Sequence, residues 1–221
     1  IIKKMNDVKN IIAVETSSDI CGISFISNGI CLKTIQEKSE RKHIEKIPLF
    51  YKSLQESIGF ELSDVSAIAV SIGPGSFTGL RIGLSFSKGL AFSNNLPMIP
   101  VSTMMSLAFS CNSKKPDVGI IHSHGEKIFC QKIDWKSNLP EPIDEIRVMT
   151  WIDFLAEYDN TKKTFQKNCD ALLTTEDLIT AELSSENVGV LANFKFDDLV
   201  IREPHNLVSN YVSPFVINKN K

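Results

Sequence analysis

The chain has 221 residues, of which 43% are hydrophobic and 23% charged, and a formal net charge of −2 at pH 7. This composition is typical of a globular protein and excludes a mainly disordered chain. The near-neutral charge also excludes the broad basic face of a domain that binds nucleic acid by itself, so we expect any contact with RNA to need a partner.

The predicted location is the cytoplasm. No apolar run reaches the roughly 18 residues that span a membrane. Residues 1–10 are polar and contain lysines, without the apolar core of a signal peptide. The cysteines are scattered and lack a C-x-x-C pair, which indicates reduced thiols rather than disulfides or a zinc site. They are Cys21, Cys31, Cys111, Cys130 and Cys169.

The first predicted elements are three β-strands, in the β-prone runs 11–15, 21–26 and 30–35. Asn28 and Gly29 separate the second run from the third, and both residue types tolerate positive φ at the centre of a tight hairpin turn. The pattern therefore predicts a three-stranded antiparallel meander.

A helix is predicted next, over residues 39–59, because apolar residues recur there at steps of three and four. Pro48 lies inside this range and lacks a backbone donor, which predicts a kink or a late start of the helix near it. The continuous β-type run 65–71 then predicts a buried parallel strand, reached through the helical crossover.

A glycine-rich turn joins this strand to a helix expected over about 78–93, which Ser76 or Thr78 can cap. Such a turn points backbone N–H groups and the positive end of the helix macrodipole outward, which suits an anion. The candidate anion or nucleotide loop consists of Gly73, Gly75, Ser76, Thr78 and Gly79. The turn matches neither a Walker A loop, which needs a lysine, nor G-x-G-x-x-G. A purely structural turn explains these glycines equally well.

Later elements have weaker signals. We expect a short strand at 97–100, a helix through 105–109 capped by Ser102, and a hairpin formed by 118–122 and 127–133. Short helices are predicted at 150–158 and 175–183, and a surface tail at 201–221.

The whole phrase Gly73-Pro-Gly-Ser-Phe-Thr-Gly-Leu-Arg-Ile-Gly83 is more specific than its glycines, and it resembles the signature of the bacterial TsaB family, also called YeaZ. Glu15-Thr16-Ser17, the His43 helix with its internal proline, and Pro100-Val-Ser102 agree with that family. The resemblance covers residues 11–110 and is loose beyond them.

The resemblance implies an α/β fold of the actin-like and Hsp70-like (ASKHA) architecture, with two similar subdomains of mixed sheets and flanking helices that face a cleft. It implies an N-terminal subdomain at 1–107, with the glycine loop and the partner-binding helices, and a smaller, divergent C-terminal subdomain and tail at 108–221. It also implies a non-catalytic partner of TsaD, the subunit that attaches a threonylcarbamoyl group to adenosine 37 of tRNAs.

The histidines argue against a catalytic metal. Catalytic relatives hold a metal with two histidines four residues apart on the first long helix, but here Ile47 follows His43 at that spacing. We expect His43 at the surface or in an interface. His122 and His124 alternate on a strand and point to one face, yet a transition-metal site needs at least three ligands and His205 is far away in sequence. No metal ligands and no catalytic residues are therefore assigned.

The two helices of the first half carry apolar or small residues beyond those that one sheet face needs, which is typical of a surface for a partner. The partner-interface candidates are Ile44, Ile47, Tyr51, Leu54, Gly79, Ile82, Gly83, Phe86 and Leu90. Gly79, Gly83, Ser87 and Ala91 recur every four residues and leave room for another backbone. The alternative is that the apolar and small residues of both helices pack entirely against the sheet and the rest of the first half of the same chain.

These inferences lead to the hypothesis of a non-catalytic subunit that binds and activates TsaD for tRNA threonylcarbamoylation. The resemblance implies TsaE as an ATPase in a larger complex, a homodimer when TsaD is absent, and only indirect contact with tRNA. No intrinsic cofactor is expected, while ATP or ADP at a shared complex interface stays open. The alternatives are a self-sufficient nucleotide-dependent transferase or kinase of the same fold, with the 73–79 loop as its anion cradle, and a simple homodimeric binding module.

Overall fold

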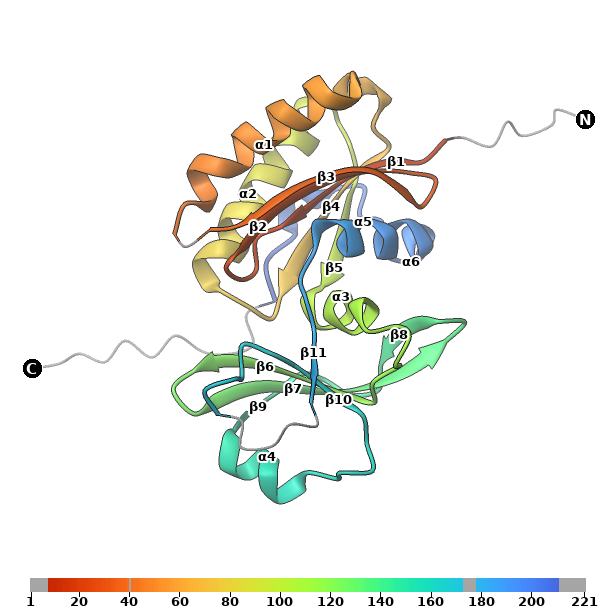
Figure 1. The fold of residues 1–221 in the computed structure, drawn as a ribbon. Coiled ribbons are helices and arrows are strands. Elements are labelled where there is room, and N and C mark those ends of the chain that lie inside the picture. Colours follow the sequence, from red (N-terminus) through yellow and green to blue (C-terminus); the bar gives the residue numbers. More distant parts are fainter. Residues whose placement is uncertain (1–7, 40, 173–177, 211–221) are drawn as a thin grey trace, which may run out of the picture.

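The structure is a computed structural model that describes residues 8–39, 41–172 and 178–210. Within these ranges two β-sheets lie one above the other (Figure 1). The first sheet contains β1 (Asn10–Glu15), β2 (Ile20–Ser27), β3 (Ile30–Lys38), β4 (Ala67–Gly73) and β5 (Met98–Ser102), in the spatial order β3-β2-β1-β4-β5. The second contains β6 (Val118–His124), β7 (Lys127–Lys136), β8 (Leu139–Pro142), β9 (Arg147–Thr150), β10 (Thr164–Lys167) and β11 (Ile179–Thr180), in the order β11-β10-β6-β7-β8 with β9 beside β7.

The predicted meander is confirmed, because β1, β2 and β3 pair antiparallel in sequence order. Asn28 and Gly29 form the tight turn with φ of 49° and 81°, values that these residue types adopt at low cost. β4 runs parallel to β1, as predicted, and β5 runs parallel to β4. The helical crossover therefore places the glycine-rich turn at the carboxyl end of a central strand.

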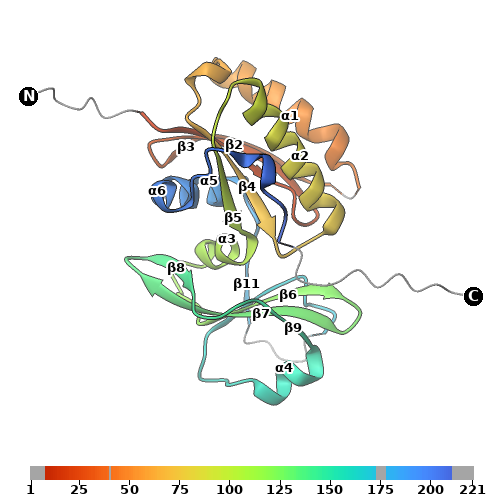
Figure 2. The same ribbon diagram turned by 180° about the vertical axis from the view of Figure 1, so that it is seen from behind.

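Helices cover both faces of the first sheet. α1 (His43–Ile58) and α2 (Phe77–Ser93) lie side by side on one face, as Figure 2 shows. α1 begins well before Pro48 and runs through it, so the late start is wrong. Alternation along β1 divides the core, because Ile12 and Val14 pack on the α1–α2 side whereas Ile11 and Ala13 pack on the opposite side.

The opposite face is covered by α5 (Ser185–Phe194), a helix that the sequence reasoning missed. Its N-cap is Ser184, whose hydroxyl accepts a hydrogen bond from the Glu186 N–H. The helix predicted at 175–183 is wrong at Ile179 and Thr180, which form β11 because they pair parallel to β10, and residues 175–177 lie outside the described residues.

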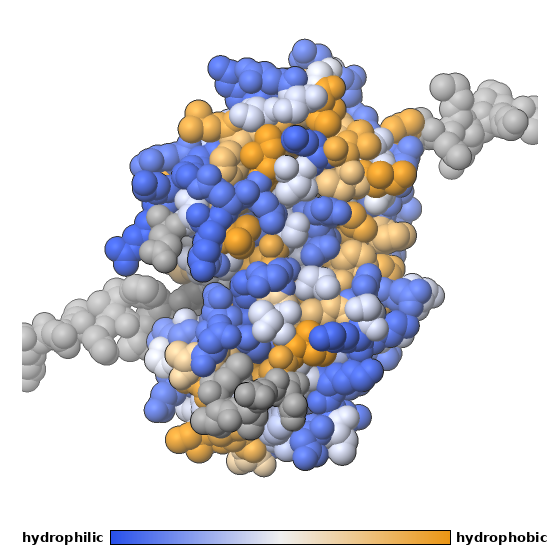
Figure 3. Space-filling model, in the orientation of Figure 1, coloured by the Kyte–Doolittle hydropathy of each residue, from blue (hydrophilic) through white to orange (hydrophobic). Residues whose placement is uncertain are grey.

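Other elements of the second half follow the predictions. The β6–β7 hairpin is confirmed, and α4 (Trp151–Glu157) is the helix expected at 150–158. α3 (Thr103–Ser110) packs on one face of the second sheet and is capped by Ser102, as predicted. α4 packs on the other face of the second sheet, and Ile152 on this helix is exposed. α4 lies at the bottom of Figure 1, and Figure 3, in the same orientation, shows hydrophobic surface at that end of the molecule.

The last described residues return to the first sheet. α6 (Phe196–Leu199) follows α5, the Ile201 backbone pairs with Met98 of β5, and the Asn210 N–H donates to the Ile72 carbonyl. The chain changes sheets between Ser102 and Val118, near the expected boundary, but residues 185–210 are not part of the second sheet. The division into 1–107 and 108–221 therefore stays a prediction, and residues 211–221 of the expected tail lie outside the described residues.

Candidate functional site

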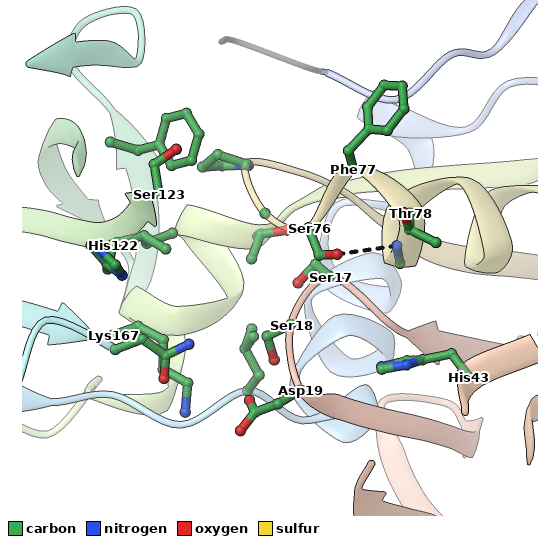
Figure 4. Close-up of a pocket in the computed structure, with 18 of the residues that line it drawn as sticks. Ser17, Ser18, Asp19, His43, Ser76, Phe77, Thr78, His122, Ser123 and Lys167 are labelled. Carbon is green, nitrogen blue, oxygen red and sulfur yellow. Dashed lines mark hydrogen bonds between the residues drawn. The ribbon is translucent and has the colours of Figure 1, made fainter. Parts of the chain in front are cut away.

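A cleft of about 790 Å³ lies between the two halves of the molecule. Figure 4 shows Ser17, Asp19 and Ser76 on the side of the first sheet, opposite His122 and Lys167 from the second. The cleft is lined by Ser17, Ser18, Asp19, Ser39, Arg41, His43, Pro74, Gly75, Ser76, Phe77, Thr78, Gly79, Ile82, Thr103, Leu107, Ile121, His122, Ser123, His124, Phe129, Lys167, Asn168 and Leu183.

Glu15, at the end of β1, anchors the turn 16–18, whose residues Ser17 and Ser18 line the cleft. One carboxylate oxygen accepts hydrogen bonds from the Ser17 N–H and hydroxyl, both at 2.6 Å, and the other accepts from the Ser71 hydroxyl. Burial raises the pKa of Glu15, although these hydrogen bonds favour the charged form. The carboxylate is thus occupied by its own chain and fixes the turn 16–18 against β4.

The turn 16–18 also holds the first residues of α2 in place. The Ser17 carbonyl accepts from the Ser76 N–H at 2.7 Å, and the Thr16 hydroxyl donates to the Gly79 carbonyl at 2.9 Å. A Cβ at Gly75 or Gly79 would lie less than 3.0 Å from the Ser17 or Thr16 carbonyl oxygen. The glycines are therefore required by the close approach of the two backbone segments.

The candidate anion loop only partly faces the cleft. Gly75, Ser76, Thr78 and Gly79 line it, while Gly73 adopts φ of 117° at the turn and does not. The N–H groups of Ser76 and Gly79 already donate to the Ser17 carbonyl and the Ser76 hydroxyl, respectively. Anion binding by this loop stays a prediction.

Basic side chains dominate the charged lining of the cleft. Arg41 and Lys167 approach it from the two halves, and Asp19 is the carboxylate that lines it in the described part of the chain. Lys167 is paired with Glu182 at 2.8 Å. Desolvation opposes the charge of Asp19, but the hydrogen bond and charge of Lys38 outweigh it and lower the pKa of Asp19.

Each histidine that lines the cleft has a hydrogen-bond partner within the chain. His43 is buried, which corrects the expected surface position, and its Nε2 lies 3.1 Å from the Ile20 carbonyl oxygen. His122 Nε2 lies 2.9 Å from the Gly125 carbonyl oxygen, and His124 Nδ1 lies 3.1 Å from the Ser123 hydroxyl. Among the described residues no group of three or more histidine, cysteine, aspartate or glutamate side chains is arranged to hold a metal ion.

A few polar groups in the cleft walls had no signal in the sequence. Ser39 and Thr103 are buried, line the cleft, and have hydroxyl groups without a hydrogen bond in the described part of the chain. One carboxylate oxygen of Asp19 is likewise buried and unpaired there. Such groups gain a partner when a polar ligand enters a cleft.

A second hollow follows the outer surface of α1 and α2, and we call it the α1–α2 groove. It has a volume of about 560 Å³ and is lined by Ile44, Ile47, Pro48, Phe77, Thr78, Arg81, Ile82, Ser85 and Phe86. The Arg81 guanidinium stacks 3.7 Å from the centre of the Phe77 ring. Tyr51 and Phe86 meet edge to face at 6.0 Å and link the two helices beneath the groove.

The interface candidates divide into an outer and an inner set. Ile44 is 66% exposed, and Tyr51, Ile82, Phe86 and Leu90 are half-buried.

The inner set is covered by the chain itself, and its role in an interface stays a prediction. Ile47 lines the groove but is only 1% exposed, and Leu54 is fully buried in the core. Gly79 and Gly83 are buried against Thr16, so the backbone that approaches the small-residue stripe belongs to the same chain.

Sequence reasoning also missed parts of the exposed surface. Leu49 is 61% exposed and Phe92 is 92% exposed, and both lie outside the stripes that the helical period selected. The sequence carried no signal for them, because single exposed apolar residues are common on protein surfaces. No helix in the described part of the chain is long and apolar enough to cross a membrane.

Comparison with protein families gives a match to the model of TsaD, the tRNA N6-adenosine threonylcarbamoyltransferase, over residues 34–131. The chain is 37% identical over 98 residues to the tRNA threonylcarbamoyladenosine biosynthesis protein TsaB of Escherichia coli, which is 44% of this chain and 42% of that protein. It is 24% identical over 218 residues to TsaB of Buchnera aphidicola, which is 96% of this chain and 91% of that protein. The match to the Escherichia coli protein thus spans less than half of its length.

Solved structures agree over nearly the whole chain. YeaZ from Pseudomonas aeruginosa superimposes with a TM-score of 0.74 at 22% identity, covering 86% of this chain and 93% of that one. A second structure, described as similar to peptidase YeaZ from the same organism, gives a TM-score of 0.80 at 21% identity, covering 93% of this chain and 100% of that one. The fold is therefore that of YeaZ, with two α/β subdomains as expected for the actin-like (ASKHA) architecture, and the sequence is similar to TsaB proteins.

Proposed function

We propose that this chain is a non-catalytic subunit of the machinery that forms threonylcarbamoyladenosine at position 37 of tRNA, and that it binds and activates TsaD through the α1–α2 groove. The names of its TsaB relatives support the pathway. The observation that carries the mode of action is the groove itself, where apolar side chains of two parallel-lying helices remain exposed.

The groove has the shape and chemistry of a helix-binding surface. Ile44 lines it and is 66% exposed, and burying this side chain in a complex would contribute up to about 1.5–3 kcal/mol. Ridges of a partner helix fit the furrow between α1 and α2. Arg81 at the edge, held over Phe77, offers a bidentate contact for a carboxylate of the partner.

The same groove accounts for the other proposed partners. When TsaD is absent, a second copy of this chain covers the exposed Ile44 in the groove, which gives a homodimer. TsaE joins the larger complex as its ATPase, and tRNA is contacted only through the partners. Phe77, Thr78 and Ile82 line both the groove and the cleft, so ATP or ADP bound in the cleft would lie next to the docked partner.

The non-catalytic role is supported by the way reactive groups are used. Glu15 accepts hydrogen bonds from Ser17 and Ser71, the Ser76 hydroxyl caps α2, and the His43 ring bonds to a backbone carbonyl. These groups maintain the structure, and the Ser76 hydroxyl and the His43 ring are each bonded to backbone groups.

The test is complex formation with TsaD, using a matched pair of variants. Ile44→Asp places a carboxylate in the groove, and we expect it to weaken binding by about 3 kcal/mol, which is more than a hundredfold in Kd. Ile152→Asp is the control, because Ile152 is 67% exposed, like Ile44, but lies on α4. Size-exclusion chromatography at micromolar concentration measures the complex. Co-elution of the Ile44 variant at wild-type strength, or tRNA modification at full rate without this chain, would overturn the proposal.

The cleft favours one alternative, a self-sufficient nucleotide-dependent transferase or kinase. Its volume is sufficient for a nucleotide, and α2 begins at its edge. Against it stands the shortage of carboxylates for a magnesium ion, because Asp19 already pairs with Lys38 at 3.1 Å. Turnover of ATP by the isolated chain with magnesium would favour this alternative, and its absence would remove it.

A further inference from the structure

A separate cavity of about 280 Å³ lies between the second sheet and α4, on the face of the sheet opposite the cleft. It shares no lining residue with the cleft or the α1–α2 groove. Its inner walls are formed by the buried Cys130, Phe154 and Thr164 and the half-buried Val118 and Tyr158. We call it the α4 cavity.

Charged and exposed side chains surround the mouth of the α4 cavity. Arg147 pairs with Glu157 at 3.0 Å, and one oxygen of Asp159 accepts from the N–H and hydroxyl of Thr161. The ammonium groups of Lys132 and Lys162 make no hydrogen bond or close ion pair with the described residues. The hydrogen bonds from Thr161 and, less strongly, the charge of Lys162 lower the pKa of Asp159.

The mouth is therefore suited to a single negative charge. Among the described residues, its cations are Lys132, Arg147 and Lys162 and its carboxylates are Glu157 and Asp159, which leaves one net positive charge. A monoanion neutralises that excess, whereas the two carboxylates repel a dianion. The interior rejects a fully hydrated ion, because its walls are apolar around Val118 and Phe154.

We propose that the α4 cavity binds a small monocarboxylate with an apolar body, its carboxylate between Lys132 and Lys162 and its body against Val118 and Phe154. The volume equals that of about nine water molecules at roughly 30 Å³ each, so the ligand has about ten heavy atoms. The Cys130 thiol lies on the inner wall, and desolvation raises its pKa, so it contacts the body as a neutral group.

The test is a titration of the full chain, labelled with ¹⁵N, with phenylacetate. We expect saturable amide shifts at Val118, Cys130, Phe154 and Thr164, with a Kd on the order of 1 mM for about ten heavy atoms. Neutral 2-phenylacetamide and phenyl phosphate, which is mostly dianionic above pH 7, should each bind at least about tenfold more weakly.

Variants connect the binding to the two lysines. The double variant Lys132→Gln with Lys162→Gln should raise the Kd about tenfold. The double variant Lys127→Gln with Lys136→Gln is the control, because it also removes two positive charges, at the two ends of β7 and outside the cavity lining, and it should leave the Kd unchanged. The proposal is overturned if phenylacetate gives no saturable shift at about ten times the expected Kd. Equal binding of the neutral amide, or an unchanged Kd when the double variant of Lys132 and Lys162 keeps a native spectrum, also overturns it.

Discussion

Gly79→Ala tests whether the glycines of α2 serve internal packing. A Cβ at this position would lie less than 3.0 Å from the Thr16 carbonyl oxygen, and that oxygen belongs to backbone that cannot rotate away. Thr16 itself is buried, and its hydroxyl donates to the Gly79 carbonyl, so the two segments are held from both sides. The substitution must therefore push α2 away from the turn 16–18.

The expected cost follows from two opposing effects. Replacing glycine by alanine inside a helix stabilises it by up to about 1 kcal/mol. Overpacking a tight contact costs about 1–3 kcal/mol and occasionally more, and a backbone clash lies at the upper end. We expect Gly79→Ala to lower the free energy of unfolding by about 2 kcal/mol.

Gly89→Ala is the matched control in the same helix. A Cβ at Gly89 has no neighbour within 4 Å, so this variant should gain stability by up to about 1 kcal/mol. Urea unfolding followed by circular dichroism measures both variants, and the difference between them should be about 3 kcal/mol. If Gly79→Ala is as stable as Gly89→Ala, the packing explanation of the glycine signature is wrong.

Three further outcomes follow from burial and pKa shifts. Leu54→Ala should cost about 2–5 kcal/mol in urea unfolding because Leu54 is fully buried, whereas Ile44→Ala at the exposed groove should change stability by less than about 0.5 kcal/mol. Burial raises the pKa of Glu15 above 4.5, so its contribution is complete below pH 4.5 and is lost as the pH rises through the raised pKa. Glu15→Gln should remove that loss from a plot of Tm against pH, and an unchanged slope contradicts the assignment. Burial raises the pKa of Cys21 to about 11 and of Cys169 to about 12, so iodoacetamide at pH 8 should modify both thiols only after unfolding in urea, as mass spectrometry can show.

The first half could be predicted because its signals are local. Asn28-Gly29 fixes a hairpin within four residues, and Ser76 and Ser102 cap the helices that follow them. Each of these structures depends on residues close in sequence, so a single sequence contains what is needed.

The sequence could not separate exposed from buried interface candidates. The helical period shows which residues share a face of a helix, but it does not show what packs against that face. Leu54 and Ile44 both belong to the apolar pattern of α1, yet the first is buried and the second is exposed. The stripe that begins at Gly79 is covered by Thr16, which is 63 residues earlier in the chain. No local pattern reports such a contact.

The second half was harder because its elements depend on distant pairing. β11 consists of Ile179 and Thr180 and exists because these residues pair with β10. α5 covers the first sheet although it follows the second in sequence, and Gly189 lets it approach Ala13 and Ile26. Ser184 marks the start of α5 in the sequence, but no local pattern indicates which sheet this helix packs against.

The glycine signature has a sufficient structural explanation without a ligand. Gly73 turns the chain with positive φ, Ser76 caps α2, and Gly75 and Gly79 admit the backbone of the turn 16–18. These contacts press one side of α2 against the end of β1, and the other side is left to form the groove and part of the cleft. A helix held this rigidly presents its outer residues in fixed positions, which lowers the entropy cost of docking a partner. Packing within one chain therefore accounts for the glycine phrase, and the partner proposed for the groove would meet a helix that is already fixed in place.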